Sequence, residues 1–237
     1  MLPRRRRSRR SAYSPGDLKL SEFAQFRKIA YTLFSFLFLY PTDERLREVV
    51  VLAQGLGGED EPLSTFPFYT SWRELVDAAK RLKPEAVQGE YGNLFLGCGS
   101  CLACESAYLG REAPAMTVVS LDQEYASCGF ALSADLEEPP DHAGVELAFM
   151  SLLCEKEESA WRTKNVADAL SLLGRERGFL ERHLCRWFPE FAGCVRSKGS
   201  GVYARAAEAA RIFMASDGDL LDAILNAKLE QAGGARQ

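Results

Sequence analysis

The sequence predicts an all-α fold organised as a single helical domain. Apolar residues recur at steps of three and four along most of the chain, which is the spacing of helices with one buried face. Short alternating runs of β-branched residues, typical of half-buried strands, are almost absent. The chain has 237 residues, 47% of them apolar, and this length fits one domain with a substantial core better than two.

The amino-terminal part is predicted to contain two helices after a basic tail. Residues 1–20 include six arginines and are expected to be disordered. Helical spacing then runs over residues 23–40 until Pro41 interrupts it. A second helix is expected over residues 42–55, and the segment 55–62, rich in Gly, Glu, Asp and Pro, is expected to be a loop.

The middle of the chain is predicted to continue as short helices. Ser71-Trp72-Arg73-Glu74 has the pattern of a capping box, in which the Ser and Glu side chains satisfy free amides at a helix start. Pro84 suits the first turn of the next helix, which is expected to end before Gly97. Residues 98–104 then form a loop, and apolar spacing over 118–130 indicates another helix.

The carboxy-terminal half is predicted to hold longer helices. Pro139-Pro140-Asp141 marks the start of a helix that runs to about Glu157, and Asn165 begins the next one. We expect the helical domain to cover residues 21–232, followed by a disordered tail over 233–237. The remaining helices are expected to break near Pro189, at residues 198–201 and at residues 216–218.

The distribution of charge limits the partners that the sequence favours. The net charge is −4, but without the six arginines of the tail the chain carries 23 basic against 33 acidic residues. An acidic body favours cationic ligands and argues against nucleic acid as the main partner. For the arginine-rich tail, contact with nucleic acid or anionic lipid stays an alternative.

Neither the amino-terminal segment nor the cysteines indicate export. Arg9-Arg10 and the apolar run over 29–40 resemble parts of a twin-arginine signal, but charged residues lie between them and no small-residue cleavage site follows. The run is also shorter than the ~20 residues that span a bilayer. Seven cysteines are too few and too irregularly spaced for a secreted disulfide scaffold. We therefore expect a cytoplasmic protein without stable membrane insertion.

Three closely spaced cysteines raise the question of a metal site. Cys98, Cys101 and Cys104 match part of a bacterial ferredoxin run, whose thiolates bind iron. The next cysteine of such a run is replaced here by Tyr108, so a fourth ligand has to come from Cys128 or another distant residue. A metal or iron–sulfur protein is therefore the alternative prediction, beside small residues that merely line a loop.

Catalysis has little support in the sequence. The chain has two histidines, and it contains no Ser-His-Asp arrangement and no Walker-type glycine motif. We expect a protein that is not an enzyme and that carries no cofactor.

The segment 138–153, EPPDHAGVELAFMSLL, has the more informative pattern. If it is helical, His142, Glu146 and Met150 lie on one stripe, so a carboxylate stands beside a soft apolar strip. Such a surface suits a peptide in which arginines precede an apolar stretch. The ordinary alternative is that Asp141 caps the helix, Phe149 is part of the core and Glu146 is solvated.

Five segments carry a resemblance to one protein family: Arg27 through Tyr31 to the stretch 39–44, Tyr-Gly-Asn-Leu-Phe at 91–95, Glu-Ser-Ala-Tyr-Leu at 105–109, the Glu-Pro to Phe-Met stretch at 138–150, and the Phe, His-Leu and Trp-x-Pro-x-Phe pattern over 179–191. Together they resemble the TorD/DmsD/NarJ-type family of redox-enzyme maturation chaperones, over about residues 21–230. Leu102-Ala103-Cys104 departs from the Pro-Pro-Tyr of that family, and a second proline follows Glu138.

The resemblance implies a cytoplasmic, non-enzymatic chaperone with a TorD-like helical fold, either a monomer or a homodimer. Its implied partner is a molybdopterin-containing oxidoreductase subunit, bound through its twin-arginine signal peptide or its body until the cofactor is inserted. Asp141 and Glu146 are implied to meet guanidinium groups, and His142 to orient the loop. The signal-peptide-binding residues implied in this way are Tyr91, Phe95, Glu105, Ser106, Tyr108, Asp141, His142 and Glu146.

Overall fold

The computed structural model describes residues 20–56, 63–96, 101–109, 114–133 and 136–234. In this part of the chain the regular elements are helices, and the β structure is limited to one isolated antiparallel bridge between Cys104 and His142. The predicted all-α class is therefore confirmed. Most of the predicted amino-terminal tail, most of the predicted loop 55–62 and Cys98 lie outside the described residues.

The helices largely follow the predicted order. Thr42 accepts the amide of Arg45 and caps the second helix, and Asn165 accepts the amide of Asp168 at the start of the seventh. The elements are α1 (Leu20–Phe38), α2 (Asp43–Gly55), α3 (Tyr69–Ala79), α4 (Pro84–Tyr91), the π-helix η2 (Gly92–Leu96), the 3₁₀-helix η3 (Glu105–Ala107), α5 (Pro114–Ser127), α6 (Ala143–Arg162), α7 (Val166–Arg182), α8 (Leu184–Lys198) and α9 (Val202–Gly234).

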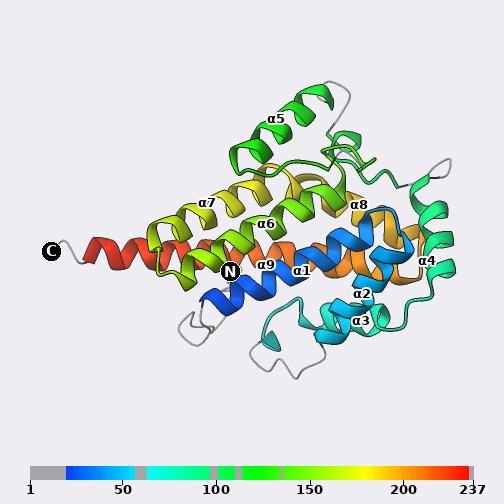
Figure 1. The fold of residues 1–237 in the computed structure, drawn as a ribbon, viewed down its shortest axis with the longest axis horizontal. Coiled ribbons are helices and arrows are strands. Elements are labelled where there is room, and N and C mark those ends of the chain that lie inside the picture. Colours follow the sequence, from blue (N-terminus) through cyan, green and yellow to red (C-terminus); the bar gives the residue numbers. More distant parts are fainter. Residues whose placement is uncertain (1–19, 57–62, 97–100, 110–113, 134–135, 235–237) are drawn as a thin grey trace, which may run out of the picture.

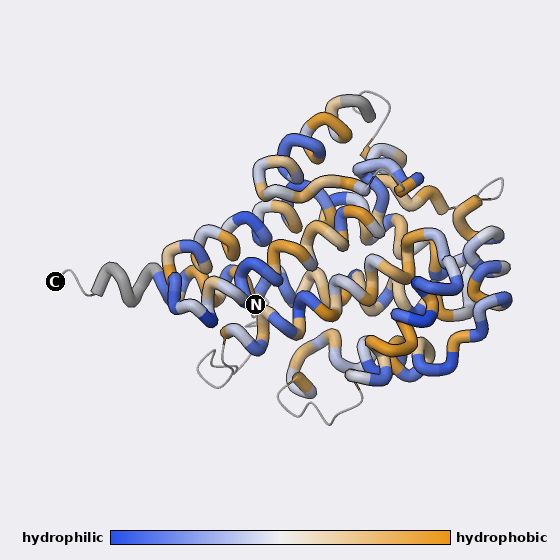
Figure 2. Tube along the Cα trace, in the orientation of Figure 1, coloured by the Kyte–Doolittle hydropathy of each residue, from blue (hydrophilic) through white to orange (hydrophobic). Residues whose placement is uncertain are grey.

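The long helices form the body of the molecule. Helix α1 packs along α6, α6 packs on α7, and α9 packs against α8, α7 and α3 (Figure 1). Helices α2, α3 and α4 gather at one end, whereas α5 lies at the edge of the bundle. Apolar and hydrophilic residues alternate along these helices, as expected when one face of each is buried (Figure 2). No helix among the described residues has the length and apolar character needed to cross a membrane.

Three local predictions about helix boundaries are wrong, and in each case tertiary packing decides. The chain continues as helix through Pro189 in α8, where Trp187 and Phe191 are fully buried and hold the segment despite the lost hydrogen bond. Helix α9 also continues through residues 216–218, because Asp217 is buried in an ion-pair cluster. Helix α3 begins before the predicted capping box, since buried Phe68 sets its start.

The α6 boundaries also differ from the prediction. The N-cap residue of this helix is His142 and not Asp141. The helix ends at Arg162, beyond the predicted end at Glu157. The predicted carboxy-terminal tail begins too early, because α9 runs to Gly234 and the last residues lie outside the described part.

A buried arginine joins the central helices. Arg27 of α1 is fully buried and donates to Glu157 of α6 at 2.7 Å, to Glu176 of α7 at 2.5 Å and to Asp217 of α9 at 2.6 Å. Cys154 brings a thiol within 4.8 Å of the Glu157 and Glu176 carboxylates. Since the guanidinium already supplies positive charge to both carboxylates, this group is an ion-pair cluster that fixes the mutual position of the helices.

Candidate functional site

The residues named by the sequence gather around one segment, the loop 101–109, which lies between α8 and the start of α6. Its backbone is held at several points: Cys101 donates to the Leu94 carbonyl at 2.8 Å, and Ala103 accepts the amide of Ala143 at 2.7 Å. Glu105 donates its amide to the Asp141 carbonyl at 2.9 Å. These bonds attach the loop to η2 on one side and to the start of α6 on the other.

Asp141 joins this loop to α6 with its side chain as well. Its Oδ2 atom accepts the Ser106 amide at 3.1 Å, so the carboxylate caps the short helix η3. His142 follows and caps α6, with Nδ1 accepting the Gly144 amide at 3.2 Å. Burial lowers the pKa of His142 to about 4, so the ring is neutral at neutral pH and able to accept this hydrogen bond.

A second network runs from the loop to the junction of α7 and α8. His183 places Nδ1 2.8 Å from Glu105 Oε2 and Nε2 3.2 Å from Glu124 Oε1, and Arg182 binds the same Glu124 at 2.9 Å. Burial opposes the charged ring, but hydrogen bonds to Glu105 and Glu124 outweigh it and raise the pKa of His183 to about 9. The imidazolium therefore bridges α5 and the loop.

Glu146 is the most unusual group of the site. It is fully buried on α6, and its Oε2 atom accepts the Trp187 indole N–H at 3.3 Å. Its Oε1 atom has no hydrogen-bond partner among the described residues. Burial first, and then the Glu105 carboxylate, raise the pKa of Glu146 well above its usual value. One oxygen of the side chain thus has no donor, and its surroundings favour the protonated form more than water does.

Aromatic rings close the site beside this carboxylate. Tyr108 stacks on Trp187 with ring centroids 5.5 Å apart, and it also contacts Phe191 at 6.4 Å. Phe95 also contacts Phe191, with ring centroids 6.0 Å apart, and its ring lies 4.9 Å from that of Tyr91. The predicted residues therefore form two adjoining groups, one polar and one aromatic, which Trp187 connects because it binds Glu146 and stacks on Tyr108.

Both sequence interpretations place Glu146 at an accessible surface, whereas the structure buries it together with Glu105 and Asp141. Glu146 is 0% exposed, Glu105 1% and Asp141 2%, so the alternative of a solvated Glu146 is wrong. A peptide cannot touch these carboxylates while the loop keeps its position. Among the predicted residues, Ser106 and Tyr108 are partly exposed, and Phe149 is part of the core as expected.

The predicted three-cysteine metal site is not compatible with the structure. Cys101 forms a disulfide with Cys194 of α8, so its sulfur has no thiolate to offer a metal. Burial, followed by the nearby Asp141 carboxylate, raises the pKa of Cys104 to about 12 and keeps it a neutral thiol. Cys98 lies outside the described residues.

Some residues of the site were missed by sequence reasoning. His183 and Trp187 stand inside the segment 179–191 that carries the family resemblance, and this was the signal that could have placed them in the site. Glu124 and Cys194 follow no motif. They reach the site only through the packing of α5 and α8, which no local spacing predicts.

Comparison with known proteins agrees with this architecture. Residues 66–193 match the nitrate reductase delta subunit family. The chain belongs to this family. The prediction of a TorD/NarJ-type redox-enzyme maturation chaperone, and not an enzyme, is thereby confirmed.

Individual relatives are chaperones as well. The chain is 37% identical over 124 residues to the selenate reductase assembly chaperone protein of Thauera selenatis, covering 50% of this chain and 61% of that protein. It is 34% identical to the chlorate reductase assembly chaperone protein of Ideonella dechloratans, covering 54% of this chain and 68% of that protein. The chain thus spans about three fifths of the length of the selenate reductase assembly chaperone protein.

A solved structure shares the fold. The crystal structure of a putative redox enzyme maturation protein from Archaeoglobus fulgidus superposes with a TM-score of 0.54 at 25% identity, covering 87% of this chain and 99% of that one.

Proposed function

We propose that this protein is an assembly chaperone for the catalytic subunit of a molybdopterin-containing oxidoreductase and acts in the cytoplasm before that subunit is exported. It binds the twin-arginine signal peptide of the subunit, alone or with the folded body, and retains it until the cofactor is inserted. Membership of the family supports the chaperone class, and the names of the selenate and chlorate reductase relatives support a reductase as the client.

The observation that carries the signal-peptide part is the unpartnered Oε1 atom of Glu146. It is fully buried beside the Glu105 and Asp141 side chains. Among the described residues, the His183 imidazolium is the cation that pairs with Glu105. A buried carboxyl oxygen without a donor destabilises the protein by about 1–3 kcal/mol, so a ligand that brings N–H groups is favoured there. The guanidinium of arginine supplies several N–H donors in one planar group.

The aromatic group beside the carboxylate suits the next part of such a peptide. In twin-arginine signals an apolar stretch follows the arginines. Tyr108 stacks on Trp187, which binds Glu146, and the aromatic group continues through Phe191 to Phe95 and Tyr91. Neutral His142 keeps the start of α6 in place by accepting the Gly144 amide. Access requires the loop 101–109 to move away, because Glu146 has no exposed surface in the closed arrangement.

Calorimetry with a synthetic twin-arginine peptide and the purified full chain tests the proposal. Glu146→Gln keeps the shape of the side chain but cannot carry a charge, and we expect it to weaken binding at least about tenfold. The matched control is Glu155→Gln, on the same helix but 62% exposed, which should bind like the wild type. Replacing both peptide arginines with lysine should also weaken binding, since lysine lacks the planar fork.

The raised pKa of Glu146 adds a second readout. Pairing with a guanidinium favours the ionised form of this carboxyl group, whereas burial favours the protonated form, so binding should promote release of a proton and weaken as the pH falls. The measured enthalpy should then depend on the ionisation heat of the buffer, and this dependence should vanish in the Glu146→Gln variant. Equal affinities of the wild type and this variant, or no binding to any molybdoenzyme signal peptide, would contradict the proposal.

A further inference from the structure

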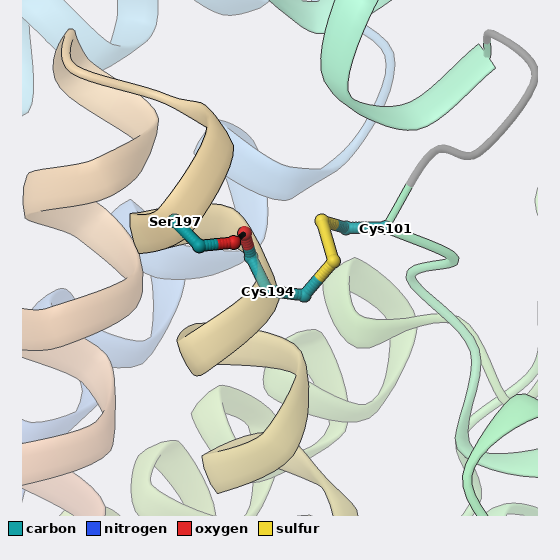
Figure 3. Close-up of a disulfide and its surroundings, with 3 residues drawn as sticks. All are labelled: Cys101, Cys194 and Ser197. Carbon is teal, nitrogen blue, oxygen red and sulfur yellow. Dashed lines mark hydrogen bonds between the residues drawn. A yellow bond between two sulfur atoms is a disulfide. The ribbon is translucent and has the colours of Figure 1, made fainter.

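One covalent bond connects the loop 101–109 to the rest of the fold. Cys101 stands at the start of this loop, and Cys194, 93 residues later in sequence, belongs to α8 (Figure 3). Their Cα atoms are 5.8 Å apart. The bond therefore attaches the segment that carries Glu105, Ser106 and Tyr108 to the helix that carries Trp187 and Phe191.

The partner on α8 is the fixed side of this connection. Ser197 donates its hydroxyl to the Cys194 carbonyl at 2.7 Å in the last turns of the helix, and neighbouring Val195 is fully buried (Figure 3). Before η3 the loop side contains no helix and depends on separate backbone bonds, from Cys101 to the Leu94 carbonyl and across the single bridge between Cys104 and His142. If the disulfide opens, the loop is the part that moves.

The position of the loop decides whether the candidate site is open. The Glu105 side chain extends from the loop to His183. Tyr108 stacks on Trp187, whose indole N–H donates a hydrogen bond to Glu146. The loop also brings Cys104 and Glu105 close to the fully buried Glu146 side chain. Moving the loop away removes Tyr108 from Trp187 and opens a path to that side chain.

We propose that the Cys101–Cys194 disulfide is a redox-controlled latch on this site. With the bond intact the loop 101–109 stays over Glu146, and with the bond reduced the loop opens and admits a cationic, arginine-bearing segment. The identity of that segment rests on the function proposed above, whereas the latch itself rests only on the disulfide and the contacts of the loop. The device adds control by the thiol redox state to client binding.

The chemistry requires a dithiol reductant. One of its thiolates attacks a sulfur of the bond, which breaks the Cys101–Cys194 bond and forms a mixed disulfide. Cys194 is only partly buried whereas Cys101 is fully buried, so attack at the Cys194 sulfur is favoured and Cys101 leaves as a thiolate that takes up a proton. The second thiol of the reductant then displaces Cys194, and the reductant becomes a disulfide while both cysteines become thiols.

Three of the four free cysteines described, Cys104, Cys154 and Cys185, leave this pair undisturbed. Cys104 is a neutral thiol at physiological pH and therefore a poor nucleophile toward the neighbouring disulfide. Cys154 is fully buried within the ion-pair cluster of Arg27. Cys185 is exposed on the same helix as Cys194, does not belong to the pair and offers a matched control.

The first measurement compares the oxidised and reduced forms of the wild-type full chain. Peptide mapping without reduction, after treatment with diamide, should detect Cys101 linked to Cys194. Hydrogen–deuterium exchange of residues 101–109 should then accelerate by about tenfold or more when the protein is reduced with a dithiol, because opening exposes amides that are bonded in the closed form. Absence of the linked peptide, or equal exchange in both forms, would overturn the latch.

The variants and the peptide separate this idea from the proposed function. Cys194→Ser should exchange like the reduced wild type under all conditions, while Cys185→Ser should keep the wild-type response to reduction. A synthetic twin-arginine peptide should bind the reduced protein at least about tenfold more tightly than the oxidised protein. Equal affinity in both forms would overturn the gating of the site, whereas changed exchange without binding in either form would contradict the proposed function and leave the latch supported.

Discussion

The bridging histidine gives a prediction whose magnitude follows from the structure. His183 pairs with Glu105 of the loop and Glu124 of α5, and together these contacts raise the pKa of its ring from 6.5 to about 9. Because the folded-state pKa lies above the unfolded one, the protonated ring stabilises the fold fully below about pH 6.5, and this stabilisation is lost as the pH rises through about 9.

The expected size of this contribution is moderate. A rise from 6.5 to about 9 corresponds to about 3 kcal/mol of unfolding free energy. The Glu124 side chain keeps 27% of its surface exposed, and screening by solvent reduces the expected value to about 2 kcal/mol. The same pair, seen from Glu124, lowers the pKa of that carboxyl to about 2, even though burial acts against this, and the two effects must not be added.

Urea unfolding at about pH 6 and about pH 10, on the wild type and on His183→Gln, measures this contribution. The glutamine keeps hydrogen-bonding groups but does not titrate, so the wild type should lose about 2 kcal/mol more than the variant between the two pH values. Comparison with the variant cancels the titration of lysines and tyrosines elsewhere in the chain. The same loss of stability in both proteins would refute the bridging role of the imidazolium.

Two further predictions concern the helix body and can be checked by urea unfolding. Arg27→Met should lower the unfolding free energy by about 3–5 kcal/mol because it leaves buried carboxylates without their cation. Glu176→Gln should change it by about 1 kcal/mol or less, because Glu157 and Asp217 still pair with the guanidinium. A wild-type stability for Arg27→Met would contradict the cluster. Gly144→Ala should cost about 1–3 kcal/mol, since its Cβ would meet the Leu39 side chain at 2.6 Å, whereas Gly89→Ala in α4 has free space and should stabilise slightly. Equal effects of the two alanines would refute this close approach of Leu39, directly after α1, to α6.

The helical class and most helix starts could be predicted because they depend on local patterns. Apolar spacing and side-chain caps such as Thr42 and Asn165 act within a few residues of one another. The breaks predicted near Pro189 and at residues 216–218 are also local arguments, and they are wrong. There the burial of Trp187 and Asp217 against distant helices outweighs the low helix propensity of the segment.

The sequence predicts several residues of the candidate site, but it does not predict how they are buried. Family motifs selected Glu105, Asp141 and Glu146, which the structure brings together around the loop and the start of α6. Their burial could not be predicted, because it depends on the loop 101–109 folding back over α6. The disulfide could not be predicted either, because the sequence groups Cys101 with Cys98 and Cys104 as candidate metal ligands and its partner lies 93 residues away.

The closed loop has a consequence for the affinity of any peptide that needs Glu146. A site that is open in only a fraction of the molecules binds with an affinity reduced by that fraction. If the contacts of the loop favour the closed form by about 3 kcal/mol, the apparent affinity falls roughly 150-fold below that of the open form. A chaperone has to release its client after maturation, so intrinsically tight pairing of Glu146 with a guanidinium is compatible with function only when closing the loop competes with it. The covering contacts of Glu105 and Tyr108 therefore set the affinity as much as the carboxylate itself, and a disulfide that stabilises them weakens binding without touching the peptide.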